Sequence, residues 1–298
     1  PPSSTTIARS QQGNLKRLLN QHRLDVNLHL PTDRLLAHAG GPQGHLAHRA
    51  EGGQLDDGMA LLDGSTDLSS RLDSSLGIGG SWTAGVLNAT ATLGLVRSSA
   101  PDGPYDAMKV GIAPTDADGV TLSAYDMDVT APAGNDHAAV GETQIRFGRL
   151  RLGNAHGSEL LDLPLPLSVQ YWNGSQFATH AADNCTRLNS SSIGLGNYTG
   201  SLASGETSTS PATISFAAGV GALTLTRPGS GNSGSVDVCV DLGSDPAGGT
   251  TCSAANASMS YLQGKWAPGT NWDNDPRARA TFGIYKNANE FIYLREMY

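Results

Sequence analysis

The chain consists of short runs in which apolar and polar residues alternate, and turn residues separate one run from the next. Runs such as AMKVGIAP, ALTLTR and SVDVCVDL recur at a spacing of about eight to twelve residues. Gly, Ser, Thr, Asn and Pro fill the intervals, and only 15% of the 298 residues are charged. Alternation with a period of two is typical of half-buried strands. The pattern predicts an all-β protein with two β-sandwich units of immunoglobulin-like or jelly-roll-like type.

The segment VQYWNGSQF, residues 169–177, carries the strongest hairpin signal in the chain. Asn173 and Gly174 lie between two alternating runs and predict a two-residue type I′ turn, because both central residues of that turn need positive φ. The alternation then places Trp172 and Phe177 on a polar face, diagonally opposite each other. These rings either form a platform for a sugar or a partner protein, or a second sheet or domain covers them.

Three zones of different composition predict three parts of the chain. Residues 1–60 predict a His-rich tail or linker, with a short helix over NLKRLLNQH, and five of the eight histidines lie here: His22, His29, His38, His45 and His48. Glycine and proline interrupt this tract, which favours a solvated tail over a metal site. Its composition also resembles an off-frame translation of a GC-rich gene. Residues 61–143 predict one sandwich unit, and residues 144–298 predict a second unit with a Ser/Gly-rich loop.

Three further segments predict particular strands. Residues 121–131 and 143–155 each predict one strand, and Gly148 marks a bulge or crossing point in the second. TFGIYK and FIYLREMY flank NANE and predict a terminal hairpin. Its last strand either closes the sandwich in place or is donated to a neighbouring sheet edge.

The charge of the chain excludes some classes of partner. The formal net charge is −8 and the isoelectric point is about 5.4. Phosphate binding needs a dense basic patch, which the sequence lacks, so we expect no nucleic acid and no anionic membrane surface as a partner. We also expect no membrane insertion, because no run of about 18 apolar residues is found.

The three cysteines lie in strand and turn contexts without the spacing of zinc ligands. Cys239 and Cys252 flank a predicted loop, and we expect a disulfide between them, which implies an oxidising compartment. Cys185 is then left over, either as a buried thiol or as half of an intermolecular bond.

Paired aspartates are the candidate metal ligands. Calcium binds carboxylates that converge at a turn, and the candidate ligands are Asp116, Asp118, Asp126 and Asp128. The segment beginning at Asp116 is not an EF-hand, because its twelfth position is Met127 instead of glutamate. The alternative is that these aspartates only cap turns. We expect no other cofactor.

No catalytic constellation is found in the sequence. Glycoside hydrolysis needs two carboxylates at a fixed separation, and no pair of acids can be singled out. A serine nucleophile motif and a histidine with a partner in sequence are also missing. We therefore expect a protein that is not an enzyme.

Three long segments resemble the carboxy-terminal region of the family of the MSHA biogenesis protein MshQ. They are SAPDGPYDAMKVGIAPTDADGVTL, TQIRFGRLRLGNAHGSELLDLPLPLSVQYWNGSQF and NDPRARATFGIYKNANEFIYLREMY. The resemblance covers residues 61–298, and the first sixty residues depart from it. It implies an exported protein at the surface of a Gram-negative bacterium, secreted or cell-bound, whose signal segment is not in this chain. It also implies an association with the biogenesis of a type IV pilus, and no catalytic residues.

These observations favour a structural or adhesive module whose partners are pilus subunits or surface glycans. The rings expected to form the contact surface are Trp172, Phe177, Trp266 and Trp272. The alternatives are a polysaccharide-binding module, a glycan-active enzyme, or a filament subunit that forms homo-oligomers by strand exchange.

Overall fold

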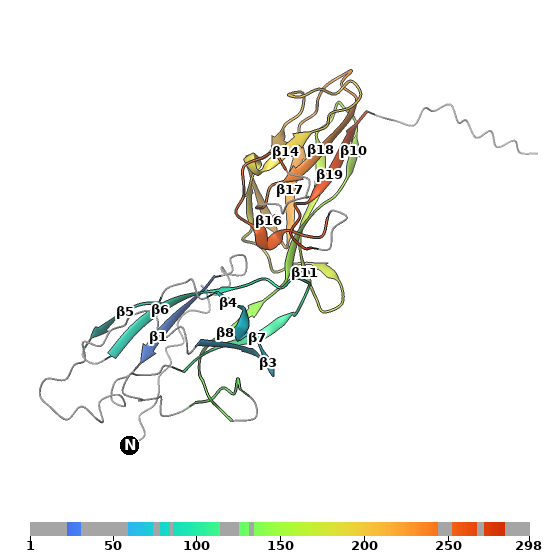
Figure 1. Ribbon diagram of the computed structural model, residues 1–298. Helices are drawn as coiled ribbons and strands as arrows, with labels where there is room; N and C mark the ends of the chain where they lie inside the picture. The colour runs from blue at the N-terminus through green and yellow to red at the C-terminus, as the bar shows by residue number, and fades with distance from the viewer. Residues whose placement is uncertain are drawn as a thin grey trace, which may run out of the picture. The chain divides into compact units, whose positions relative to one another are not determined.

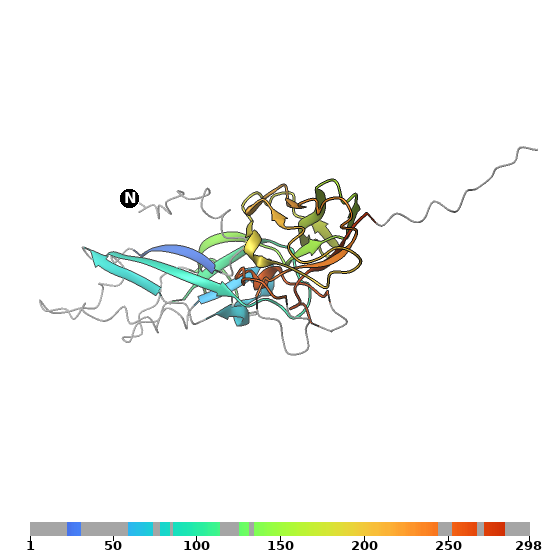
Figure 2. The ribbon, with the colours of Figure 1, turned by 90° about the horizontal axis from the view of Figure 1, so that it is seen from above.

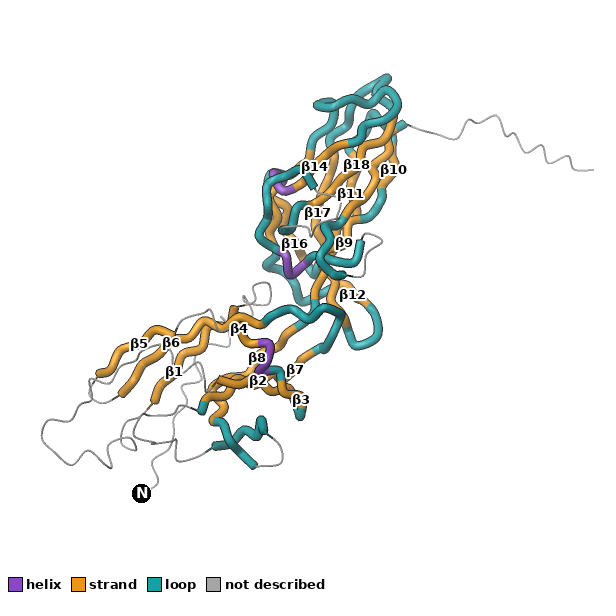
Figure 3. Tube along the Cα trace, viewed as in Figure 1, coloured by secondary structure: helices purple, strands orange, loops and turns teal. Residues whose placement is uncertain are grey.

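The computed structural model describes residues 23–30, 59–73, 78–83, 86–113, 125–130, 134–243, 252–266 and 271–283. Nearly all regular structure in these ranges is β-strand (Figure 3). Their helical elements are three single 3-10 turns, η4 (Ser69–Arg71), η5 (Ser190–Ser192) and η6 (Ser260–Leu262). The prediction of an all-β protein is confirmed. None of the helices in these ranges has the length and apolar character that crossing a bilayer requires.

The chain divides into two compact units. Unit 1 comprises Pro1–Phe147 with Trp172–Ser175, and unit 2 comprises Gly148–Tyr171 with Gln176–Tyr298. The division falls between β8 (Ala138–Ile145) and β9 (Gly148–Leu152). The prediction of one continuous strand over residues 143–155 was therefore wrong. Gly148, the expected crossing point, is the first residue of β9.

Unit 1 contains two four-stranded sheets. One has the order β3-β2-β7-β8; in the other, β6 pairs with β1, β4 and β5. β1, β5 and β6 lie side by side, as the blue and cyan arrows of Figures 1 and 2 show. The remaining bounds are β1 (Arg23–Leu30), β2 (Met59–Asp63), β3 (Thr66–Asp67), β4 (Leu72–Asp73), β5 (Ile78–Thr83), β6 (Val86–Leu95) and β7 (Tyr105–Ile112).

The core of unit 1 is built around β2. Met59 and Leu61 pack into one apolar cluster with residues of β7, whereas Ala60 and Leu62 pack into another with Met127. Burial on both faces explains why MALLD reads as a continuous apolar run instead of an alternating one.

β1 lies in the amino-terminal zone for which the sequence predicted only a tail or linker. It pairs with β6 along its whole length, from Arg23 opposite Gly94 to Leu30 opposite Leu87. The helix predicted over NLKRLLNQH lies outside the described residues.

Residues 125–130 do not form the strand predicted for that region. Their only ladder contact is an isolated bridge between Met127 and His137. Aspartate side chains take the place of a partner strand here: Asp136 accepts hydrogen bonds from the backbone N–H groups of Val129 and Thr130, both at 2.9 Å. Such side-chain acceptors compete with strand pairing.

Unit 2 is a two-layer sandwich. β9, β11, β17 and β16 are neighbours in one sheet, and the other sheet has the order β10-β19-β18-β14 (Figure 1). The further bounds are β10 (Ala155–Gly157), β11 (Leu163–Trp172), β12 (Phe177–Thr179), β13 (Arg187–Asn189), β14 (Ile193–Gly196), β15 (Thr209–Ser210), β16 (Thr213–Ala217), β17 (Val220–Leu225), β18 (Gly234–Val240) and β19 (Arg277–Phe282).

The strand order of unit 2 is that of an immunoglobulin-like sandwich. In chain order, β9, β11, β14, β16, β17, β18 and β19 take the places of strands A to G, which gives sheets ABED and CFG. β10 pairs parallel to β19 and so joins the second sheet directly after the first strand. Buried side chains from both sheets form one core, among them Leu150, Leu167, Ile214, Phe216, Val236, Val240, Ala280 and Phe282.

The predicted hairpin is present, but its turn differs from the prediction. β11 ends at Trp172 and β12 begins at Phe177, so the loop has four residues instead of two. Gly174 has a φ of 97°, whereas Asn173 does not adopt positive φ. Its Oδ1 instead accepts hydrogen bonds from the N–H and the hydroxyl of Ser175, both at 3.0 Å. Asparagine favours a turn either through its backbone or through its side chain.

The Ser/Gly-rich stretch contains both strands and irregular backbone. It holds β14, β15 and β16, and residues 197–208, between β14 and β15, form no helix or strand. Ile193, Ile214 and Phe216 from this stretch are buried in the core of unit 2. Most of the predicted terminal hairpin lies beyond residue 283, outside the described residues.

The structure contains the disulfide between Cys239 and Cys252, with an S–S distance of 2.02 Å. It joins β18 to the segment that follows Cys252. This segment contacts η5, where the backbone N–H of Ala255 donates to the carbonyl of Ser191. Cys185 is exposed and lies outside the disulfide, so the alternative that it is a buried thiol was wrong.

Candidate binding site

Three of the four rings predicted as contact surface lie around one arginine of unit 2. The guanidinium carbon of Arg149 is 3.7 Å from the ring centre of Phe177 and 4.8 Å from that of Trp266. The ring centres of Phe177 and Trp272 are 5.2 Å apart, with an angle of 31° between the planes. All four side chains are half-buried. Their cation–π and ring contacts fix the rings relative to one another. We call these four residues the arginine–aromatic site.

The pleat of β9 places Arg149 in this site. Leu150 and Leu152 are buried in the core, so Arg149 and Arg151 project from the opposite face of the strand. On β11, Gln170 lies directly opposite Arg149, and its Oε1 accepts a hydrogen bond of 2.9 Å from the Arg149 Nε. Gln170 is buried, so this contact holds the guanidinium against the sheet.

The two tryptophans belong to a loop between η6 and β19, residues 264–274, which we call the tryptophan loop. Gly264 and Asn274 close its base through two backbone hydrogen bonds, each of 2.9 Å. Trp266 and Trp272 lie two residues inside this closure, one on each arm. Residues 267–270, between the arms, lie outside the described residues.

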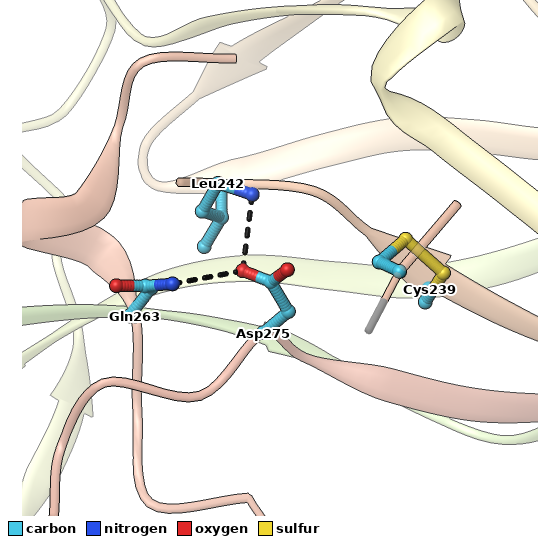
Figure 4. The surroundings of a disulfide bond; sticks show 5 residues. Cys239, Leu242, Gln263 and Asp275 are labelled. Atoms are coloured by element: carbon cyan, nitrogen blue, oxygen red, sulfur yellow. Dashed lines mark hydrogen bonds between the residues drawn. A yellow bond between two sulfur atoms is a disulfide. The ribbon is translucent and has the colours of Figure 1, made fainter. Parts of the chain in front are cut away.

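A buried carboxylate anchors the base of the tryptophan loop. Asp275 Oδ1 accepts hydrogen bonds from the backbone N–H of Leu242, at 3.0 Å, and from the side-chain amide of Gln263, at 3.1 Å. The disulfide of Cys239 lies close by (Figure 4). Asp275 thus joins the residues after β18, the end of η6 and the start of β19, and it holds the base of the loop that carries both tryptophans.

Three buried polar atoms of the tryptophan loop have no hydrogen-bond partner. They are Nε1 of Trp266, Oδ1 of Asp273 and Oδ1 of Asn274. Buried polar groups are nearly always paired, and exceptions often mark a place where a ligand or water supplies the partner.

The charge of Arg149 is not balanced by an acid. Burial lowers the pKa of Arg149 to about 10, and the nearby positive charge of Arg151 adds to this effect. The guanidinium therefore stays charged at neutral pH. Neither Arg149 nor Arg151 forms an ion pair with any residue that the structure describes. An uncompensated, half-buried cation flanked by rings can hold an anionic or polar ligand.

Trp172, the fourth predicted ring, falls in unit 1, whereas the arginine–aromatic site belongs to unit 2. It is half-buried at the end of β11, and its backbone N–H donates to the carbonyl of Phe147 at 2.9 Å. The prediction that Trp172 contacts a ligand remains a prediction.

The structure describes two of the four predicted calcium ligands, Asp126 and Asp128. Asp116 and Asp118 lie outside the described residues. Asp126 and Asp128 are exposed, and Asp126 Oδ1 accepts a hydrogen bond of 2.7 Å from the N–H of Ala139. Across the described ranges, no three His, Cys, Asp or Glu side chains come together as metal ligands would.

Asp136 is the most strongly perturbed acid of this region. Burial acts to raise its pKa, but hydrogen bonds from His137 and from the N–H groups of Val129 and Thr130 outweigh that effect. They hold the pKa of Asp136 well below its ordinary value of 3.8. Asp136 is therefore a structural acceptor that is ionised at neutral pH.

Sequence reasoning missed Arg149 as a member of the site and Gln170 as its hydrogen-bond partner. The alternation in RFGRLRL already placed Arg149 and Arg151 on one face of a strand. No local pattern indicated that β9 pairs with β11, because this pairing depends on the topology of the sandwich. Nor did the sequence indicate that the tryptophan loop returns to the same sheet.

The fold and the site define a class of architecture, an immunoglobulin-like β-sandwich with a cluster of half-buried aromatic rings and one arginine. A family model described as DUF6701, fourth domain, matches residues 146–297, just over half of the chain. The chain belongs to this family. A search of the curated proteins found no match.

Proposed function

We propose that this chain is a non-enzymatic adhesive or structural module of an exported bacterial surface protein, associated with the biogenesis of an MSHA-type type IV pilus. In this proposal the arginine–aromatic site is the surface that contacts a pilus subunit or a surface glycan. The pilus association is supported by the sequence resemblance to the MshQ family, and the contact surface is supported by the geometry of the site.

The observation that carries the proposal is the clustering of Phe177, Trp266 and Trp272 around Arg149. Aromatic faces stack on the C–H surfaces of sugar rings and are also enriched at the centres of protein interfaces. Asp275 and the closure at Gly264 hold the base of the tryptophan loop before any ligand is bound. Such preorganisation reduces the entropy lost on binding.

The buried acids of unit 2 support a module without catalysis. Asp183 accepts hydrogen bonds from the N–H groups of Cys185 and Thr186, and Asp275 accepts one from Leu242. Carboxylates occupied in this way maintain the fold. A glycan-active enzyme would instead need two acids that face each other across the bound sugar.

The disulfide supports export. Disulfides such as Cys239–Cys252 persist in oxidising compartments, which include the periplasm and the cell surface. The predicted location of the protein, secreted or at the surface of a Gram-negative cell, agrees with this chemistry.

The proposal is tested by the binding of the purified chain to isolated type IV pili and to a glycan array. We expect binding to at least one of these targets, and we expect Trp272→Ala to weaken it at least tenfold. Leu161→Ala is the matched control, because Leu161 is an exposed apolar residue of unit 2 outside the arginine–aromatic site. Absence of binding, or equal loss with both variants at unchanged thermal stability, would contradict the proposal.

A further inference from the structure

The outer face of β9 is a cationic patch on an acidic protein. Arg149 and Arg151 are two residues apart and project from the same face, whereas the whole chain has a formal net charge of −8. Like charges at this spacing repel each other. Within the described ranges no carboxylate pairs with either arginine. The patch therefore lacks the neutralising partner that a purely structural arginine normally has.

The orientation of the Arg149 guanidinium leaves its donor edge free. Phe177 and Trp266 contact the guanidinium through their ring faces. Gln170 Oε1 accepts a hydrogen bond from the Nε of Arg149. The two terminal nitrogens form no hydrogen bond within the described residues and are not buried. The open edge of a guanidinium carries two parallel N–H donors, which match the two oxygens of a carboxylate.

We propose that the arginine–aromatic site selects glycans that carry carboxylate groups, with Arg149 as the specificity-determining residue. This inference rests on the proposed function, because it names the ligand class of the same site. The carboxylate binds the open edge of Arg149, and Arg151 adds attraction for an acidic chain. Trp272 stacks on the sugar ring next to it.

The surface around the site favours a glycan over a protein partner. Protein interfaces have a contiguous apolar core and bury about 800 Å² on each partner. The large apolar side chains that are exposed in the described ranges are Val96, Leu160, Leu161 and Val220, and none of them belongs to the arginine–aromatic site. A cluster of three half-buried rings and one arginine matches the size of one or two sugar residues.

A matched pair of probes tests the carboxylate directly. The first probe is trigalacturonate, and the second is the same trisaccharide after reduction of its carboxyl groups to neutral alcohols. Titration calorimetry with the full chain should show at least tenfold tighter binding of trigalacturonate. A sulfated trisaccharide is the third probe, and we expect it to bind at least fivefold more weakly than trigalacturonate, because a tetrahedral sulfate fits the planar fork less well.

Variants assign the selectivity to Arg149. Arg149→Gln should bring both trisaccharides to equal affinity, and Arg149→Lys should give an intermediate preference, because it keeps the charge and loses the fork. Arg279→Gln is the matched control: Arg279 lies on the other sheet, where it pairs with Asp237 at 2.8 Å, and the preference should be unchanged. Urea denaturation of each variant verifies that it folds.

The outcomes separate the two proposals. Equal binding of the acidic and neutral probes, or equally tight binding of the sulfated probe, would overturn the carboxylate inference. It would also be overturned if no trisaccharide bound while pili bound in a Trp272-dependent way, although the proposed function would then stand. If neither the trisaccharides nor the pili and glycans bound in a Trp272-dependent way, both the carboxylate inference and the proposed function would be overturned.

Discussion

Single side chains in this protein connect the core to the proposed binding surface. Asp275 is buried, yet it lies one residue from Asn274 at the base of the tryptophan loop. Its carboxylate accepts hydrogen bonds from a buried backbone N–H and from a buried side-chain amide. One residue therefore affects both the stability of unit 2 and the order of the loop.

Replacing Asp275 by alanine should lower the free energy of unfolding by about 2–4 kcal/mol, because two hydrogen-bond donors lose their acceptor. Asp275→Asn should cost less, since its amide oxygen still accepts one bond. Urea denaturation monitored by tryptophan fluorescence measures both values. If Asp275→Ala changed the midpoint no more than Asp162→Ala, an exposed acid of the same unit, the anchoring role would be wrong.

Asp136 should make the stability of unit 1 sensitive to acid. Its folded pKa lies below the ordinary 3.8, so its stabilisation is complete above that pH and is lost as the pH falls below it. Asp136→Asn should lower the melting temperature at pH 7 and flatten the decline of the melting temperature below pH 3.8 in a series of thermal scans. Asp128→Asn, at an exposed position, should leave that decline unchanged; a steep decline in Asp136→Asn would contradict the assignment.

At the scale of elements, the alternating pattern predicted most strands because burial on one face requires it. β7, β17, β18 and β19 lie where the sequence placed them. The errors arose where side-chain hydrogen bonds or the topology of the sheets determine the local structure. Asn173 closes its turn through a side-chain hydrogen bond, and β14 to β16 lie within a stretch dominated by small polar residues. β1 was missed because its runs of Arg, His and Leu resemble those of its surroundings.

The aromatic residues of the site were predictable from the sequence, but Arg149 was not. Large aromatic residues next to turns indicated Phe177, Trp266 and Trp272, whose convergence follows from the closure of the tryptophan loop. Arg149 belongs to a strand that is distant in sequence from that loop. Only the pairing of β9 with β11 brings them together, and no local pattern specifies it.

The tryptophan loop depends on a glycine. A Cβ added at Gly264 would overlap the indole of Trp266, so Gly264→Ala should displace that ring from Arg149. We expect a loss of stability of about 1–3 kcal/mol and a loss of glycan or pilus binding of at least fivefold. Gly205→Ala is a control for binding, because nothing lies within 4 Å of its added Cβ, although its φ of 90° costs stability. Unchanged binding in Gly264→Ala would contradict the role of Trp266.

The disulfide should stabilise unit 2 through the unfolded chain. It closes a loop with a sequence separation of 13, for which the chain-entropy estimate is about 3 kcal/mol. The double variant Cys239→Ser, Cys252→Ser should lose roughly that amount in urea denaturation, and addition of dithiothreitol should reproduce the loss in the wild type. Cys185→Ser should have little effect. A loss below about 1 kcal/mol would show that the bond contributes little.

At the scale of the whole molecule, an all-β chain with two units, a disulfide and a formal net charge of −8 carries a cationic aromatic cluster on its immunoglobulin-like unit. The family match covers residues 146–297, and these include that unit from Gly148 up to residue 297. The family assignment and the fold therefore concern the same part of the chain that holds the arginine–aromatic site. The proposed export and pilus association concern the complete protein, and they follow from the disulfide and the sequence resemblance.

The central claim is that Trp266 and Trp272 contact the ligand, and the indole N–H signals of the ¹⁵N-labelled chain test it most directly. The chain has four tryptophans, so four signals are expected, and single Trp→Phe variants assign them. On titration with trigalacturonate we predict that the signals of Trp266 and Trp272 shift together and saturate, while that of Trp82 stays in place. A shift confined to Trp82, or no shift at millimolar trigalacturonate, would contradict this claim.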